Sequence, residues 1–419
     1  MAVQMEQPLQ VNCKMGEGDP EMYAPPKSGT EEQPKQATNK ILKRTTSFAQ
    51  GTIATATGFL TAAFSVRKDV LLHKHILAAG GCFLVIAYLS GLLLVYLKLF
   101  LSGYKQLHRG HIRFIQFLCV ISGAALIATN SLLLLLISEG NSLLSLNLLP
   151  IQGIIGVLAY HATPTEGSMR DEAFEAGIKS GHKVALLATA TAFAVQTTVL
   201  FGYLNNSSFR AVGHPFDLSV TFMASALSVS LAVATGMPLG YRTEAARDKV
   251  LSLVRYLKDA VIALLAVTAV LIGKEFLGGD TVLALFPEIA VAATYYAVNL
   301  FTGDETAAEQ GQRGVAKEHK MELLPTAVVA TFGFGMLGAA YAALLGTPEH
   351  DMYTKALVFT LLAAVMSSLG RVAGPLCSPR CDKNAAACVV LLSNVLPIVE
   401  MLVAVPLAAK VVIDALPVS

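Results

Sequence analysis

Two carboxylates stand inside long apolar segments of this 419-residue chain. Glu288 belongs to the segment 281–301, and Glu400 belongs to the segment 386–409. If both segments cross a membrane as helices, each carboxylate lies roughly 10–14 Å below the same outer surface, at about 1.5 Å of rise per residue. Two carboxylates at one depth could share a proton or hold a cation, as they do in transporters.

A structural role for these carboxylates is the interpretation that the sequence favours. A protonated Glu could bond to neighbouring helices beside Pro287 or Pro397, where proline leaves backbone carbonyls unpaired. Arg371 could pair with a buried Glu, but we expect its guanidinium to snorkel to the membrane surface. Glu288, Glu400 and Arg371 together are the candidate intramembrane polar site.

The other polar residues do not form a recognisable catalytic or metal site. The chain has no nucleotide-binding loop, no His-Glu-x-x-His and no Gly-x-Ser-x-Gly sequence. Cys377 and Cys381 lack the second ligand pair of a zinc knuckle. Asn130, Gln196 and His161 are expected to hydrogen-bond between helices. We therefore predict no enzymatic activity, no cofactor and no bound metal.

Hydroxyl side chains also lie beside basic residues in the segment Lys43-Arg44-Thr45-Thr46-Ser47. The positive charges would attract anionic lipid, and phosphorylation, with Ser47 as the candidate, would weaken that attraction. A simple topology anchor explains the same residues equally well.

Composition places these candidates in a membrane protein. The chain is 54% hydrophobic, 14% charged and free of Trp, whereas a soluble domain of this length exposes a large charged surface. The formal net charge of +2 is uninformative by itself, and the absence of a basic patch argues against a nucleic-acid partner. The expected partner is the lipid bilayer, and a homo-oligomer stays open. Because lipid offers no partners to backbone groups, the apolar segments are expected to be helices.

Eleven segments are predicted to span the bilayer, and the first is the weakest because it is rich in Thr, Ala and Gly. They cover residues 48–66, 76–97, 114–137, 143–162, 184–204, 216–240, 259–274, 281–301, 324–345, 354–376 and 386–409. With the amino terminus inside, 24 of the 31 Lys and Arg lie on the inner side, the pattern expected of cytosolic loops. An external tail with 48–66 on the membrane surface is the alternative.

A period of 137 residues links these segments. Thr52, Thr189 and Thr326 follow one another at this interval, and His182-Lys183 recurs as His319-Lys320. A fixed period without gaps indicates a membrane unit copied in tandem. We predict a disordered cytosolic tail (1–47), two units of four helices (48–165 and 183–305) and a third unit of three helices (320–419).

The second unit resembles the plant DMP-type membrane proteins. Leu186-Leu187-Ala188-Thr189-Ala190-Thr191-Ala192-Phe193 is similar to the first-span signature of that family, and Leu323-Leu324-Pro325-Thr326 keeps its proline. Asp259, Val261 and Ala263-Leu264-Leu265 follow the family's third-span pattern, and Leu285-Phe286-Pro287 is similar to the start of its fourth span. The family's Thr-Asp-Ser after the second span is absent here.

The resemblance implies four-helix units with cytosolic ends, a role in remodelling or fusion of internal and surface membranes, and no catalytic residue. The first functional hypothesis is therefore a multi-pass membrane organiser without enzymatic activity, in the plasma membrane or an endomembrane. The second is a secondary transporter or channel that uses Glu288 and Glu400. A receptor or scaffold role of the tail is a third, weaker hypothesis.

Overall fold

The computed structural model describes residues 32–64, 74–104, 107–137, 144–161, 171–205, 215–291, 293–294, 323–344, 351–373 and 383–415, and within them the chain is all-α. The helices are α1 (Glu32–Phe64), α2 (Lys74–Leu101), α3 (Arg109–Ile137), α4 (Leu144–His161), α5 (Glu172–Asn205), α7 (Pro215–Gly236), α8 (Glu244–Leu277), α9 (Thr281–Ala284), α11 (Leu323–Leu344), α12 (Met352–Ala373) and α13 (Lys383–Ala415). A 3-10 turn, η2 (Gly278–Asp280), joins α8 to α9. Each of the eleven predicted segments overlaps a helix, but residues 237–240 of the segment 216–240 are not helical, and the ends of 48–66, 143–162, 281–301, 324–345 and 354–376 lie partly outside the described residues.

Six helical stretches in the described part of the chain are long and apolar enough to cross a membrane. They are His75–Leu101, Arg109–Leu136, Glu172–Leu200, Asp217–Gly236, Glu244–Val291 and Met352–Val372. α4 and α11 contain shorter apolar stretches. The chain is thus all-helical with several membrane-capable helices, as expected of a multi-pass membrane protein. The predicted number of eleven spans is larger than these six and stays a prediction.

Helix α1 begins earlier than the sequence predicts. Residues 32–47 were expected to belong to a disordered tail, but they form the first half of this helix. The reason is a stripe of small and apolar side chains at helical spacing, since Thr38, Ile41, Leu42 and Thr45 are all buried. Charged residues on the other face of the helix lower the average hydropathy of this segment, so hydropathy did not indicate the buried stripe. Residues 1–31 lie outside the described part.

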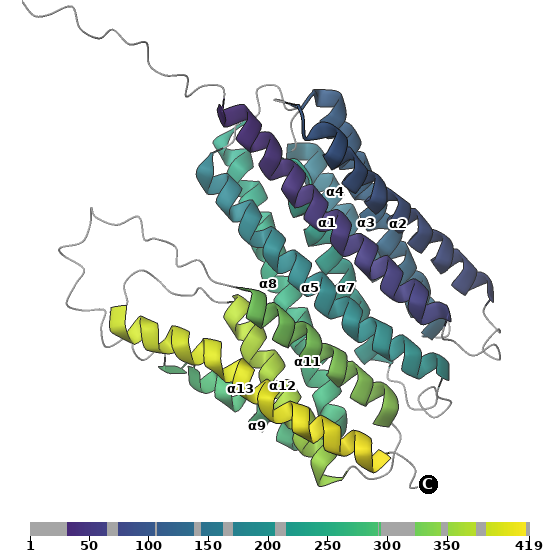
Figure 1. Ribbon diagram of the computed structural model, residues 1–419, viewed down its shortest axis with the longest axis vertical. Coiled ribbons are helices and arrows are strands. Elements are labelled where there is room, and N and C mark those ends of the chain that lie inside the picture. The colour runs from purple at the N-terminus through teal and green to yellow at the C-terminus, as the bar shows by residue number, and fades with distance from the viewer. Residues whose placement is uncertain are drawn as a thin grey trace, which may run out of the picture.

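Helix α5 lies at the centre of the bundle and packs against α1, α7, α8 and α11 (Figure 1). On one side of α5, α2 packs against α1 and α3, and α4 packs against α3 and α7. On the other side, α12 packs against α11, α13, α8 and α9. The two sets of helices are therefore joined mainly through α5 and α8.

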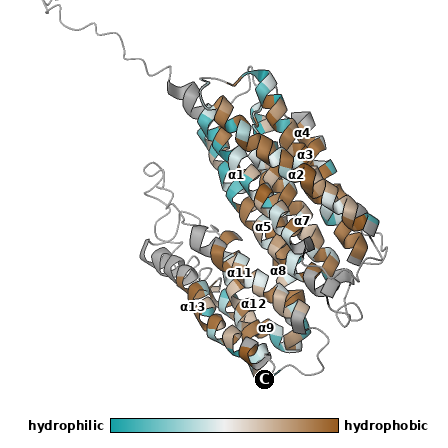
Figure 2. Ribbon diagram, turned by 45° about the vertical axis from the view of Figure 1, so that its right-hand side comes forward, coloured by the Kyte–Doolittle hydropathy of each residue, from teal (hydrophilic) through white to brown (hydrophobic). Residues whose placement is uncertain are grey.

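Helix α2 presents an apolar face to the outside of the bundle. Leu89, Tyr96 and Leu99 are 57%, 68% and 68% exposed, whereas Leu84 and Leu94 on the opposite face are buried. In water each large apolar side chain left exposed forfeits about 1.5–3 kcal/mol of burial free energy. Hydrocarbon removes that penalty, so this face is expected to contact lipid. Figure 2 shows the hydrophobic colouring along α2, α3 and α4, with hydrophilic residues gathered where α1 begins.

Candidate functional site

Glu288 is carried to helix α12 by a sharp reversal of the chain. Gly278 ends α8 with φ of 57°, a left-handed conformation that favours glycine. After η2 and α9 the chain is helical again over residues 286–291. This segment brings the Glu288 carboxylate onto Gly370 of α12, where a Cβ would overlap the carboxylate oxygens. The absence of a side chain at Gly370 therefore makes room for Glu288.

Glu400 reaches the same helix from α13. Its Oε1 accepts a hydrogen bond of 3.5 Å from the Ser367 hydroxyl on α12. Its Oε2 is buried and has no hydrogen-bond partner within the described part of the chain. Glu288 contacts the same helix within one turn of Ser367, at Gly370. The structure thus brings the two predicted carboxylates together, although 112 residues separate them in sequence.

Arg371 follows directly after Gly370 and is 9% exposed. Its side chain is thus covered by protein, and its position at the membrane surface stays a prediction. Ser367, Gly370 and Arg371 have the spacing i, i+3 and i+4, which places them on one face of α12. The two carboxylates and the Ser367 hydroxyl can share a proton or hold a small cation, whereas the Arg371 guanidinium is a permanent cation that can only donate hydrogen bonds. No group of three or more His, Cys, Asp or Glu side chains suited to a metal ion occurs among the described residues.

A second polar cluster joins α3, α5 and α7 in the buried interior. The Asn130 amide donates a hydrogen bond of 2.8 Å to the Phe222 carbonyl, and the Gln196 amide donates to Asn130 Oδ1. The Ser225 hydroxyl donates to Gln196 Oε1 at 3.1 Å. These contacts place Asn130 and Gln196 in the interhelical role that the sequence predicted, while Ser225 was interpreted only as a small packing residue. The side chain of His161 lies outside the described residues.

A third cluster, at the end of the bundle where α5 and α8 begin, was missed by the sequence analysis. The Asp171 carboxylate accepts hydrogen bonds from the Phe174 backbone N–H at 2.6 Å, from Arg247 at 2.9 Å and from the Tyr241 hydroxyl at 3.0 Å. The Phe174 N–H, followed by Arg247, lowers the pKa of Asp171 below its usual value. The available signal was an Asp directly before a helix, which is typical of an N-cap.

The basic segment before the first predicted span is docked onto the bundle at this same end. Arg44 forms an ion pair of 3.3 Å with Glu175 of α5, and the Thr45 hydroxyl donates a bond of 3.2 Å to the Gly236 carbonyl at the end of α7. Burial lowers the pKa of Arg44. Ser47 is half-buried, and its hydroxyl donates to the Lys43 carbonyl at 3.1 Å. The role of Ser47 as a phosphorylation site stays a prediction.

Cys377 and Cys381 lie outside the described residues. Comparison of the chain with protein-family models, with curated proteins and with solved structures gives no match. The resemblance to the DMP-type membrane proteins rests on its short motifs alone.

Proposed function

We propose that the protein is a multi-pass membrane organiser without enzymatic activity, built from three related helical units and similar in role to the DMP-type proteins. The observation that carries this proposal is the distribution of side chains around the bundle. Apolar residues cover the outer face of α2, and Lys43, Arg113, Lys179 and Arg242 are exposed. All four residues belong to segments that meet at the end of the bundle where α1 begins. Such a protein can contact the hydrocarbon of the bilayer through its apolar outer face and attract anionic lipid at its basic end.

The neighbours of equivalent helices support the three-unit proposal. If the repeat is correct, α1, α5 and α11 correspond, and so do α2, α7 and α12, and α3, α8 and α13. The contact of α1 with α5 then corresponds to that of α5 with α11, and the contact of α3 with α7 corresponds to that of α8 with α12. α4 packs on α7, and α9 packs on α12. Units copied in tandem are expected to stack in this repeated way.

Reconstitution into vesicles tests the proposed function. Purified protein is placed in liposomes with and without anionic lipid, and lipid mixing and vesicle shape are measured. We expect the protein to increase lipid mixing or to deform the vesicles, and more strongly when anionic lipid is present. Vesicles that keep their shape and do not mix lipids in either composition would contradict the proposal.

A second candidate function is transport of protons or a small cation. The observation that favours it is that Glu288 and Glu400 contact α12 within one turn of each other, at Gly370 and Ser367. Proton and cation flux into liposomes should then be present in the unaltered protein and absent in Glu288→Gln and Glu400→Gln. Glu244→Gln is the matched control, because that carboxylate is exposed at the start of α8. Absence of flux in the unaltered protein would remove the transporter.

A further inference from the structure

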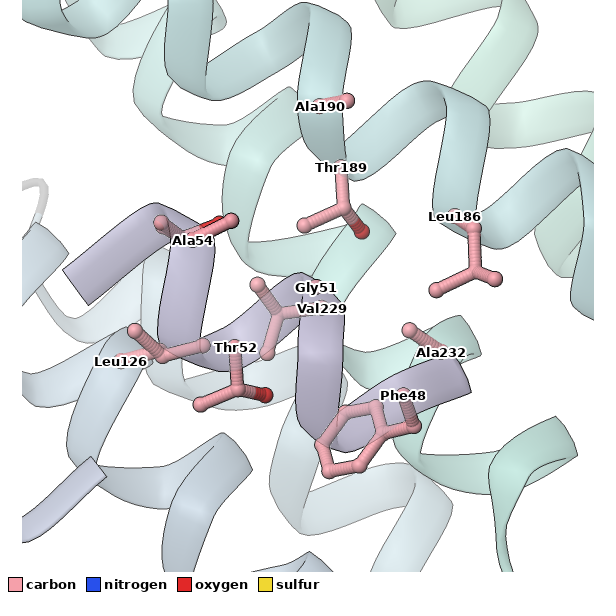
Figure 3. A pocket seen from close by; sticks show the side chains of 11 residues that line it. Phe48, Gly51, Thr52, Ala54, Leu126, Leu186, Thr189, Ala190, Val229 and Ala232 are labelled. Atoms are coloured by element: carbon pink, nitrogen blue, oxygen red, sulfur yellow. The ribbon is translucent and has the colours of Figure 1, made fainter. Parts of the chain in front are cut away.

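Gln152 of α4 is an amide on the outside of the helical bundle. None of the hydrogen bonds among the described residues involves its side chain. The interior is different, because the amides of Asn130 and Gln196 are buried there and bonded to each other. The cavity of about 110 Å³ where α1, α3, α5 and α7 meet has an almost entirely hydrocarbon surface (Figure 3). The unpaired amide that calls for a partner is therefore at the outer surface of α4.

The helix places Gln152 close to the middle of the bilayer. α4 runs from Leu144 to His161, so Gln152 lies about 12 Å along the axis from its start and about 14 Å from its end. Lys and Arg side chains near the ends of a span can reach the headgroups. An amide at the centre is surrounded by hydrocarbon, which offers neither a donor nor an acceptor. Gln152 is thus stabilised by a hydrogen-bonding partner that approaches α4 from outside.

The surface around Gln152 permits the close approach of another helix. Four exposed residues follow one another at intervals of three, four and three, the spacing of a seam between two helices, and they are Leu146, Leu149, Gly153 and Gly156. A Cβ added at either glycine would meet no atom of the described residues within 4 Å. Packing within the described chain thus does not require these glycines, although Gly is a poorer helix former than Ala. A second helix explains them, because small residues let two backbones approach closely.

A second copy of this chain is the partner that fits the amide. Copies inserted in the same orientation carry Gln152 at the same depth, and a twofold axis along the membrane normal brings one Gln152 to the other. The amide has both a donor and an acceptor group, so each Gln152 can donate a hydrogen bond to the carbonyl oxygen of the other. A Lys or a carboxylate satisfies only one of these two groups and brings a charge into hydrocarbon.

The second proposed unit lacks these features in its corresponding helix. At the offset of 137 residues Gln152 corresponds to Ile289, and the two glycines correspond to alanines. Ile289 is 53% exposed, and an apolar side chain in that position needs only lipid around it. The amide and the glycines therefore mark the outer face of α4 as different from its counterpart.

We infer that α4 forms the interface of a symmetric dimer in the membrane, in which the two Gln152 side chains bond to each other beside Gly153 and Gly156. This inference goes beyond the proposed function. It depends on the predicted span 143–162 rather than on lipid mixing or transport. A dimer would present the basic ends of two copies to the same patch of lipid.

Energy transfer between labelled copies tests the inference. The full chain is labelled at its amino terminus with a donor or an acceptor dye, both forms are reconstituted into the same liposomes, and transfer is measured as the protein is diluted with lipid. We expect transfer that persists on dilution down to a measurable midpoint density. Gln152→Leu should shift this midpoint about tenfold toward higher protein density, as expected for the loss of two interhelical hydrogen bonds. Gln152→Asn keeps an amide and should restore part of the association.

A second variant blocks the approach of the helices rather than removing the amide. Because a Cβ at Gly156 has free space among the described residues, Gly156→Ile should fold normally and abolish transfer. The matched controls lie on α1. Gln50 is exposed near the inner end of its predicted span, and a Cβ at the exposed Gly58 would also meet no described atom within 4 Å. Gln50→Leu and Gly58→Ile should leave transfer unchanged.

Three results would overturn the inference. The first is transfer in the unaltered protein no higher than that of randomly placed copies, which would assign the amide to a different partner. The second is an unchanged midpoint in both Gln152→Leu and Gly156→Ile. The third is an equal shift in the two control variants. Lipid mixing is measured on the same vesicles, and loss of mixing while the dimer persists counts against the proposed function alone.

Discussion

Gly338 of α11 lies so close to Thr198 of α5 that a Cβ at Gly338 would overlap the threonine hydroxyl. The Thr198 hydroxyl already donates to the Ala194 and Val195 carbonyls at 3.1 and 2.8 Å, which limits its freedom to move away. Close approach of backbones through small residues is a main source of helix association in membranes. The contact therefore helps to hold α11 against the rest of the bundle.

We predict that Gly338→Ala destabilises the folded protein by about 1–3 kcal/mol, because the added methyl group overpacks the interface. The measurement is the thermal unfolding temperature in detergent, with limited proteolysis to locate the loosened region. Gly335→Ala is the matched control. A Cβ there would lie 3.9 Å from the Ala194 Cβ, so this variant should unfold like the unaltered protein. Equal effects of the two substitutions would contradict the close packing at Gly338.

The buried amide pair provides a second prediction. Replacing Gln196 with Leu removes the partner of Asn130 and leaves a buried amide oxygen without its bond to the Gln196 amide. We expect a loss of about 1–3 kcal/mol in the free energy of unfolding, the cost of an unsatisfied buried polar group. Asn130→Leu combined with Gln196→Leu should cost less than the sum of the single variants, because the double variant removes both polar groups. Additive effects would show that the two amides act independently.

The Asp171 cluster predicts a pH dependence. Because its pKa is lowered in the folded state, ionised Asp171 stabilises the protein above the ordinary aspartate pKa of about 3.9. This contribution is lost as the pH falls through the lower folded value. Asp171→Asn should lower the unfolding temperature by a few degrees near pH 6, and the difference from the unaltered protein should shrink at about pH 3. The side chain is 37% exposed, so solvent reduces the effect.

Asp248→Asn is the control for this measurement, because Asp248 contacts the same Arg247 at 3.0 Å but is more exposed. It should change the unfolding temperature less than Asp171→Asn does. A difference between Asp171→Asn and the unaltered protein that stays constant from pH 6 to pH 3 would rule out the titration of Asp171 as its cause.

The helices could be predicted from the sequence because their signal is local. A run of apolar residues is visible without knowledge of the fold, and each predicted segment overlaps a helix within the described residues. The pairing of Asn130 with Gln196 was predictable in kind, because a buried amide needs a partner, but not in detail. The contact of Asp171 with Arg247 joins positions 76 residues apart. Such a pair leaves no periodic signal in the sequence.

The approach of Glu288 and Glu400 to the same turn of α12 also could not be predicted from the sequence. The sequence placed both carboxylates at one depth, but their approach depends on the reversal at Gly278 and on the space above Gly370. In each case the missing information is the relative position of helices that are distant in sequence.

The membrane topology provides the last prediction, because the predicted number of spans is eleven if α1 crosses the membrane and ten if it lies on the surface. With eleven spans, a tag at the amino terminus and a tag at the carboxyl terminus must lie on opposite sides of the membrane. In sealed vesicles with the cytosolic face outward, protease should remove the amino-terminal tag and spare the other. Detergent should then expose both tags. If both tags stay protected until detergent is added, both ends lie on the outer side and the number of spans is even, as expected of an external tail with residues 48–66 on the membrane surface.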